Sequence, residues 1–272
     1  MKEELYLTLR DSTVRKSNNF ILNSRFNLTL QQQKIMFFLT SQIGYNDTDF
    51  QEYTFKITDF CKICGIDSHG GMQYDMLKES IKTLADRSIW VTEDDGTERL
   101  IRFLDEPALN KKTGLIKVQI ARCMKPYLLQ LKKNYTSFEL LYTLRFKHKA
   151  SPRLYEVLKS RHFNDMKPYV YVVPIEDLRA LLNADTESYK QYKYFNSRVL
   201  APALKEINEQ TDLSISYKPR KNGRTITHAE FTIEQKTPIE RMQVSDDVDR
   251  AFSNEEMTYA YQIEHSKAGG QK

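Results

Sequence analysis

The sequence predicts a protein of the α+β class, because one order of helices and strands occurs twice along the chain. The short helical pattern at residues 57–65 returns at residues 175–183, and Gly65 corresponds to Asn183. In both copies a second helix follows, and then an extended run and a polar hairpin. A helix, a turn, a helix and a hairpin form the plan of a winged helix, and internal repeats determine architecture. We therefore expect two tandem winged-helix domains.

The first copy is expected to build on a helix at 30–43. Thr29 has the spacing of an N-cap with Gln32 at the third helical position. The other elements follow from apolar periodicity and turn residues. In chain order they are extended segments at 5–7 and 20–22, a strand at 53–57, helices at 59–64 and 74–85, a hairpin of 89–92 and 99–104, a strand at 115–120, and a short helix at 126–131.

The second copy is expected to begin with an apolar stretch at 138–146. Ser151 then caps a helix that has Pro152 at its first position, where a missing N–H costs nothing. A strand at 169–173 precedes the repeated helices at 175–183 and 189–209, and Pro202 should kink or divide the latter. A hairpin of 214–218 and 225–233 closes the copy, with a turn through 219–223 that contains the Asn-Gly signal.

The length of 272 residues suits two domains of this size. We place the N-terminal winged-helix domain at 1–135 and the C-terminal one at 136–236. Residues 237–272 carry 4 basic against 7 acidic side chains and few branched apolar ones. We expect this segment to be a disordered, flexible acidic tail with at most one weak helix near 254–263.

Several classes of protein and site are disfavoured by what the chain lacks. It has no apolar run of about 18 residues and no leader-like N-terminus, so we expect a cytoplasmic protein with no membrane contact. The spacing of Cys61 and Cys64 could begin a zinc site, but no second ligand pair follows, so both fit better as small buried residues. We predict no metal and no cofactor.

An enzyme is also disfavoured. No P-loop sequence is present, and the five histidines, which include His162 on an apolar helical face, are isolated from one another. The sixteen tyrosines supply possible nucleophiles, but a lone tyrosine fits a core or stacking position better. We therefore predict no catalytic residues.

Basic residues concentrate in the second copy. Residues 189–224 hold 8 basic against 3 acidic side chains, a distribution typical of a phosphate-binding surface, although a solvated helix face is the plain alternative. Helical geometry places polar and basic side chains outward, and these can contact base edges and phosphates of double-stranded DNA. They are Lys190, Gln191, Lys193, Tyr194, Ser197 and Arg198, followed in the hairpin by Lys218, Arg220, Lys221 and Arg224.

The corresponding helix of the first copy has a different outer face. It presents Asp75, Glu79, Lys82 and Asp86, and carboxylates repel a polyanion. The second copy is therefore the better DNA reader, and the first is the better candidate for contact with protein or for weaker contact with phosphate.

Three blocks of sequence also resemble one known family. The blocks are residues 16–20 with 26–30, residues 142–147 with 151–159, and residues 198–208. Together they look like the iteron-binding plasmid replication initiators, and the resemblance covers roughly residues 14–235. The resemblance implies that the C-terminal domain makes the main contacts with directly repeated origin DNA, the iterons. It further implies an N-terminal dimer interface, dimers that repress the protein's own gene at an operator inverted repeat, and recruitment of the host replicative helicase, initiator and chaperone.

A plain winged-helix transcriptional repressor is the alternative function. The DNA sequence beside the gene would distinguish an initiator from a repressor. Tandem direct repeats next to an A·T-rich stretch favour initiation, and a single inverted repeat favours repression. We expect two association states, with the monomer on direct repeats and the dimer on inverted repeats. The strands at 99–104 and 115–120 of the first copy could present an edge or a hairpin to a partner chain, and pairing through such an edge would form a symmetric dimer.

Overall fold

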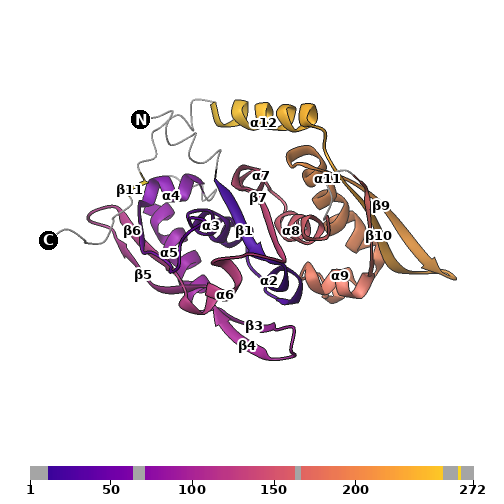
Figure 1. Ribbon diagram of the computed structural model, residues 1–272, viewed down its shortest axis with the longest axis horizontal. Coiled ribbons are helices and arrows are strands. Elements are labelled where there is room, and N and C mark those ends of the chain that lie inside the picture. Colours follow the sequence, from indigo (N-terminus) through magenta and orange to yellow (C-terminus); the bar gives the residue numbers. More distant parts are fainter. Residues whose placement is uncertain (1–11, 64–70, 163–166, 254–262, 265–272) are drawn as a thin grey trace. The chain divides into compact units, whose positions relative to one another are not determined.

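The structure is a computed structural model that describes residues 12–63, 71–162, 167–253 and 263–264. Within these residues the chain forms two compact units. The first is built from residues 31–144 with the N-terminal segment up to Ser24, and the second from residues 145–251 with the segment Arg25–Leu30. Each unit mixes helices with antiparallel strands (Figure 1), which confirms the predicted α+β class.

The first unit contains three small antiparallel sheets, of orders β1-β7, β3-β4 and β11-β2-β6-β5. Its elements are β1 (Thr13–Ser17), α2 (Asn18–Asn23), α3 (Leu30–Ser41), β2 (Tyr53–Lys56), α4 (Ile57–Ile63), α5 (Gly71–Ala85), β3 (Ser88–Thr92), β4 (Glu98–Arg102), β5 (Leu104–Asn110), β6 (Leu115–Ile120), η1 (Arg122–Met124), α6 (Lys125–Leu128), β7 (Tyr135–Glu139), α7 (Leu140–Leu144) and β11 (Ile263–Glu264).

Aromatic packing holds the core of the first unit together. Phe38 on α3 contacts the rings of Phe55 and Phe60, at 5.1 and 5.7 Å between centroids. The apolar stripe of α5 is fully buried at Leu77, Ile81 and Leu84. Asp75, Glu79, Lys82 and Asp86 are exposed on the other side of α5, as the helical period predicted.

The second unit contains one three-stranded antiparallel sheet of order β8-β10-β9. Its elements are α8 (Ser151–Arg161), β8 (Tyr169–Pro174), α9 (Ile175–Leu181), η2 (Glu187–Tyr189), α10 (Tyr192–Phe195), η3 (Asn196–Leu200), α11 (Ala201–Gln210), β9 (Leu213–Asn222), β10 (Thr225–Gln235) and α12 (Pro238–Ser253). The inward residues Phe195, Val199, Ala203, Leu204 and Ile207 of the long helical stretch are all buried, as predicted.

Some elements differ from the sequence expectation. Residues 20–22 are helical in α2, not extended, because the Ser17 hydroxyl accepts a hydrogen bond from the Phe20 N–H and caps a helix there. Strand β5 had no predicted counterpart beyond Leu104, since Pro107 lies within it. The predicted turn through 219–223 is shorter, because β9 continues to Asn222 and pairs with Thr225.

The C-terminal segment shows a further difference. Helix α12 occupies 238–253, N-terminal to the weak helix expected near 254–263. Thr237 and Glu240 cap its start, since the Thr237 N–H donates to the Glu240 carboxylate and the Glu240 N–H donates to the Thr237 hydroxyl, which is capping-box geometry. The expectations for 5–7, Cys64, Gly65 and most of 254–263 lie outside the described residues.

Candidate nucleic-acid interface

Helix α9 ends in a backbone motif that fixes the turn after it. Asn183 adopts a positive φ of 53°, a conformation that asparagine tolerates better than most residues. Its N–H donates to the Ala180 carbonyl, and the Ala184 N–H donates to the Arg179 carbonyl at 2.8 Å. This pair of bonds is a Schellman motif. The Asn183 side-chain amide also donates to the Phe26 carbonyl, which secures the turn to the segment at 25–30.

The second helix of the motif is divided, as the position of Pro202 predicted. Residues 196–200 form a π-turn in which the Ala201 N–H donates to the Asn196 carbonyl, five residues earlier. Pro202 has no N–H, so the Arg198 carbonyl lacks the usual helical donor four residues later. The His148 ring supplies one instead, with Nε2 lying 2.9 Å from that oxygen. Since the Ala150 N–H donates to Nδ1 of the same ring, the ring proton belongs on Nε2.

Glu206 connects the divided helix to the start of α8. Its carboxylate accepts from the N–H groups of Lys147 and His148, and from the Ser151 hydroxyl at 2.6 Å. An ionised acceptor makes each of these bonds stronger than a neutral one. Together with the buried apolar face, these contacts set the rotation of α10, η3 and α11 about their axis.

The five residues predicted on the outer face of this helical stretch, and Lys193 at its boundary, are all exposed. Lys190 and Gln191 precede α10, Lys193 and Tyr194 lie on it, and Ser197 and Arg198 lie on η3. The Arg198 guanidinium stacks 5.0 Å from the centre of the Tyr194 ring. The Lys190 ammonium lies 3.3 Å from the Glu187 carboxylate, and such an exposed pair is readily exchanged for another anion.

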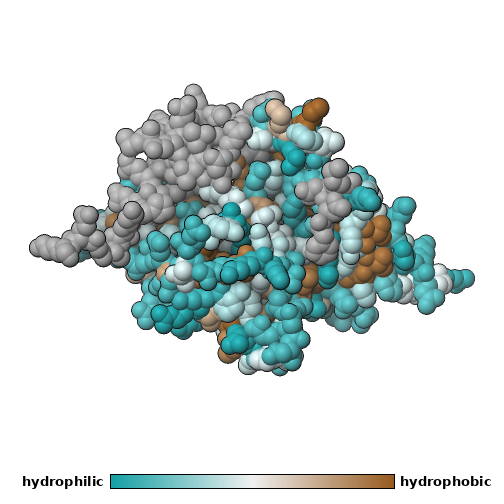
Figure 2. All heavy atoms as spheres, viewed as in Figure 1, coloured by the Kyte–Doolittle hydropathy of each residue, from teal (hydrophilic) through white to brown (hydrophobic). Residues whose placement is uncertain are grey.

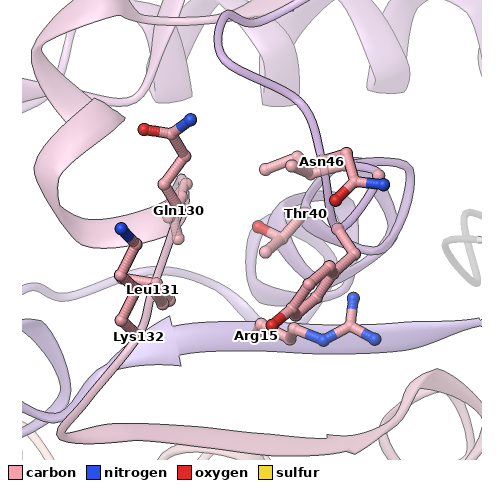
Figure 3. A pocket seen from close by; sticks show the side chains of 10 residues that line it. Arg15, Thr40, Asn46, Gln130, Leu131 and Lys132 are labelled. Carbon is pink, nitrogen blue, oxygen red and sulfur yellow. The ribbon is translucent and has the colours of Figure 1, made fainter.

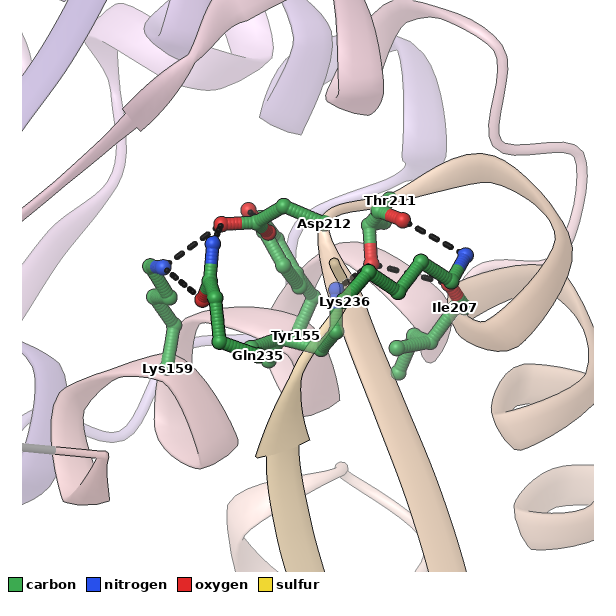
Figure 4. A network of polar contacts seen from close by, with 8 residues as sticks. Tyr155, Lys159, Ile207, Thr211, Asp212, Gln235 and Lys236 are labelled. Carbon is green, nitrogen blue, oxygen red and sulfur yellow. Dashed lines mark hydrogen bonds and ion pairs between the residues drawn. The ribbon is translucent and has the colours of Figure 1, made fainter. Parts of the chain in front are cut away.

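Two of the three acidic residues in 189–224, Glu206 and Asp212, point toward the protein, whereas Glu209 is exposed. Glu206 is occupied by backbone donors, as described above. Asp212 is buried and accepts from the Tyr155 hydroxyl at 2.7 Å, the Lys159 ammonium at 2.6 Å and the Gln235 amide at 3.0 Å (Figure 4). The charge left facing solvent is therefore more positive than the sequence count alone indicates.

Burial by itself would raise the pKa of the Asp212 carboxyl. The charge of Lys159, and the hydrogen bonds from Lys159, Tyr155 and Gln235, outweigh burial, so this pKa is held below its usual value of 3.8. Next to it, the Lys236 ammonium donates to the Thr211 carbonyl at 2.7 Å. This network joins α8, the end of α11 and both ends of the β9–β10 hairpin.

The β9–β10 hairpin has the form of a wing. Its inward side chains, including Ala229, Phe231 and Ile233, are buried, whereas its projecting tip is hydrophilic (Figure 2). Gly223 has a φ of +60° in the two-residue turn, where a side chain would be strained. Lys218, Lys221 and Arg224 are exposed and make no ion pair within the described part of the chain. Arg220 pairs with Glu230 across the hairpin.

A hollow of about 690 Å³ lies where the wing meets the start of the helical stretch. Lys190 and Arg224, both predicted, line it together with Arg179 and Tyr192, which the sequence reasoning missed. The Arg179 guanidinium donates to the Lys190 carbonyl at 2.8 Å and stacks on Phe195. The Tyr192 and Tyr217 hydroxyls are hydrogen-bonded to each other, which ties the helix start to β9. No periodicity in the sequence signals these cross-element contacts.

Cys61 and His162, which the sequence singled out, are both buried. No group of three or more His, Cys, Asp and Glu there could hold a metal ion. Cys61 is fully buried, and burial raises the pKa of its thiol to about 12, so it stays protonated. His162 is buried directly after α8. No helix within the described ranges has the length and apolar character needed to cross a bilayer.

Comparison with known proteins agrees with this architecture. Residues 13–159 match the family model described as Initiator Replication protein, WH1, and residues 174–233 match Initiator Rep protein, WH2. The chain is 23% identical over 263 residues to the PI protein of Escherichia coli, covering 85% of this chain and 86% of that protein.

A solved structure shares the fold. It is described as the crystal structure of Pi initiator protein in complex with iteron DNA, and it superposes with a TM-score of 0.67 at 19% identity, over 84% of this chain and 99% of that one. The two winged-helix domains predicted from the internal repeat are thereby confirmed. The two matched models together span most of the chain, and the protein belongs to the family of initiator replication proteins.

Proposed function

We propose that this protein is a sequence-specific double-stranded DNA-binding replication initiator of a plasmid, which binds directly repeated origin sequences. The observation that carries the proposal is the charge arrangement of the second unit. Polar and basic side chains face solvent on α10, η3 and the wing, while Glu206 and Asp212 face inward. Family membership and the iteron complex of the Pi initiator protein support the same proposal.

In this proposal one set of residues contacts bases and a second set contacts phosphates. Gln191, Tyr194, Ser197 and Arg198 would meet base edges in the major groove. Lys218, Lys221 and Arg224 of the wing, together with Lys190 and Lys193, would contact phosphates and set the position of the helix. Arg220 makes a weaker candidate than the sequence indicated, because Glu230 already neutralises it. Arrays of bound chains would bend the DNA, which helps a neighbouring A·T-rich segment to open.

Footprinting on the DNA that flanks the gene tests this function. We expect protection of tandem direct repeats spaced by about one or two helical turns. Protection of a single inverted repeat over a promoter, with none elsewhere, would instead support the plain transcriptional repressor. Uniform weak protection of all DNA would contradict both functions.

Self-association is the second part of the proposal, and the order of strands in the sheets narrows the surface expected for it. Strand β6 lies between β2 and β5 in its sheet, so the prediction that residues 115–120 offer a free edge is wrong. Strand β5 is at an edge, but Pro107 and a bulge between Asp105 and Ala108 interrupt it. Such features block edge pairing.

The β3–β4 hairpin, which includes most of the predicted strand at 99–104, is the remaining surface for a dimer. Trp90 and Leu100 lie directly opposite each other in its register, and they are 58% and 51% exposed. Two large apolar side chains side by side on one exposed face are typical of a contact surface. We place the dimer contact there, with the dimer repressing the gene and the monomer initiating. Recruitment of host helicase, initiator and chaperone is proposed from the family alone.

A further inference from the structure

The first unit contains a cavity of about 190 Å³ beside the end of α3. Arg15 and Lys132 both line it, but Figure 3 shows their charged groups on opposite sides of the lining. One small anion therefore does not reach both cations. An open edge of the second unit, in contrast, has a shape and a sequence that together indicate a partner.

Strand β8 forms this open edge. It pairs with β10 on one side, and no described strand pairs with its other side. The register with β10 is continuous, and residues 169–173 carry no charge. Natural edge strands are usually protected against pairing by charges, prolines or bulges. The opposite edge of the same sheet, β9, is protected in this way by Lys218, Pro219 and Arg220, whereas residues 169–173 of β8 are not.

The side chains along the open edge are apolar and accessible. Val170 is 51% exposed, Tyr169 38% and Val172 37%. The ring of Tyr171, between the two valines, stacks on the buried Phe231 with 6.4 Å between ring centres. Because side chains alternate along a strand, both valines point to the outer face of the sheet. A hydrophobic patch is visible beside the base of the wing (Figure 2).

The proline at the end of β8 shows which backbone groups are free. Pro174 lies opposite His228 and has no N–H, so this is not a hydrogen-bonded pair. Bonded and non-bonded pairs alternate along an antiparallel ladder. Val170 and Val172 are separated from Pro174 by whole steps of this alternation, so they too form non-bonded pairs with β10. Their N–H and C=O groups therefore point toward the open edge.

The sequence of the edge reads nearly the same in both directions. It is Pro168-Tyr169-Val170-Tyr171-Val172-Val173-Pro174. A second copy that lies antiparallel about Tyr171 places each Val170 opposite the partner's Val172, and each Tyr169 opposite the partner's Val173. Since both valines have outward N–H and C=O groups, each opposed pair can exchange two hydrogen bonds. The flanking prolines, which have no N–H, end the pairing on both sides.

We propose that β8 is a self-association surface, at which a second copy of the chain pairs antiparallel about Tyr171 and joins the two sheets into one. A second copy is the occupant because this register is two-fold symmetric and opposes valine to valine with no charge between them. The surface lies in the second unit and is separate from the β3–β4 contact, so it does not depend on the proposed function.

The strength of this contact follows from its size. A pairing over residues 169–173 buries less than the roughly 1,200 Å² of a stable interface. We therefore expect a weak dissociation constant, on the order of 0.1–1 mM. The contact acts where copies of the chain are concentrated.

Disulfide cross-linking of the full chain tests the contact and its register. Val170→Cys and Val172→Cys are oxidised separately and as an equal mixture, with the wild type reporting cross-links through the native cysteines. Directly opposite residues have Cα atoms about 5.5 Å apart, within disulfide range, and diagonal neighbours are about 7–8 Å apart. We expect the mixture to cross-link several times more than either variant alone. Equal cross-linking of one variant alone, or none above the wild type in the mixture, would overturn the proposal.

Light scattering at increasing concentration provides a second measurement, in the Leu100→Glu background that disrupts the β3–β4 surface. The average mass should rise with concentration. Val170→Glu combined with Val172→Glu should abolish the rise, because like charges then oppose each other across the edge. Ser216→Glu, at an exposed position on β9 of the same sheet, is the matched control and should leave the rise unchanged.

Thermal unfolding checks the fold of each variant. If the two glutamates unfold the chain, Val170→Thr combined with Val172→Thr keeps the shape of both side chains and should weaken association severalfold. A mass that stays constant with concentration in the Leu100→Glu background would contradict the proposal. So would a rise that persists unchanged in the folded edge variants.

Discussion

The direction in which individual charged side chains point determines where the second unit is positive. Lys221 is exposed near the tip of the wing and has no acidic partner among the described residues, whereas Arg220 beside it is paired with Glu230. We expect Lys221→Ala to weaken binding to all DNA sequences alike and to reduce the slope of log affinity against log salt by about one. Lys167→Ala, exposed elsewhere in this unit, is the control. An unchanged slope for Lys221→Ala would remove the wing from the contact surface.

Asp212 is a side chain whose charge acts on stability. Its pKa is lowered in the folded state, so its contribution is present above the ordinary carboxyl pKa of 3.8 and is lost as the pH falls below that value. Asp212→Asn should lower the free energy of unfolding by about 3 kcal/mol at pH 7, because Lys159, which is only 15% exposed, is left without its counter-charge.

Denaturant unfolding at several pH values checks this expectation. The difference between the wild type and Asp212→Asn should shrink as the pH falls below about 4. The exposed carboxyl of Asp185 provides the control variant, Asp185→Asn, which should be near neutral. A difference that stays constant down to pH 2 would show that the network stabilises through shape and not through charge.

Among the elements, the divided helix shows where sequence reasoning succeeds and where it ends. The apolar spacing from Phe195 to Ile207 predicted the buried face, and Pro202 predicted the division, because both depend on local geometry. The π-turn and its bond to His148 could not be predicted, since that ring comes from a segment 50 residues earlier in the chain. Arg179 and Tyr192 were missed for the same reason: their partners lie on other elements.

The short elements of the first unit also show that local sequence signals do not predict long-range contacts. Residues 20–22 are apolar enough for a strand, and only the Ser17 cap makes them helical. Strand β6 has a clear alternating pattern, but its position between β2 and β5 depends on long-range pairing that no local pattern contains. Local signals thus predicted the type of most elements, and tertiary pairing decided which edges and surfaces are free.

A double substitution tests the account of the divided helix. His148→Phe should lower the free energy of unfolding by about 1 kcal/mol, because it leaves the Arg198 carbonyl without a donor. Pro202→Ala restores an N–H four residues after Arg198, so it should stabilise the His148→Phe protein more than it stabilises the wild type. Equal effects of Pro202→Ala in both backgrounds, measured by chemical denaturation, would mean that the two groups are not coupled.

At the level of the whole molecule, the proposed function assigns DNA binding to one winged-helix unit and the repressing dimer contact to the other. We expect Leu100→Glu, which places a charge on the exposed β3–β4 face, to shift the chain toward monomer while leaving its thermal stability nearly unchanged. The variant should bind direct repeats better and inverted repeats worse than the wild type. Light scattering with and without each DNA checks this. One stoichiometry on both DNAs would remove the two-state proposal and leave DNA binding intact.

Substitution of Arg198 tests most directly the proposal that the helix contacts bases while the wing contacts phosphates. Its exposed guanidinium is held by the π-turn and the Tyr194 ring, where it can meet a base edge. In titrations with repeat-bearing and base-shuffled DNA, Arg198→Ala should lose about 1–3 kcal/mol on the repeats and relax the preference at one base pair. Arg241→Ala, an exposed arginine on α12, should lose neither. Full affinity and specificity in Arg198→Ala would contradict the assignment of base reading to this helix.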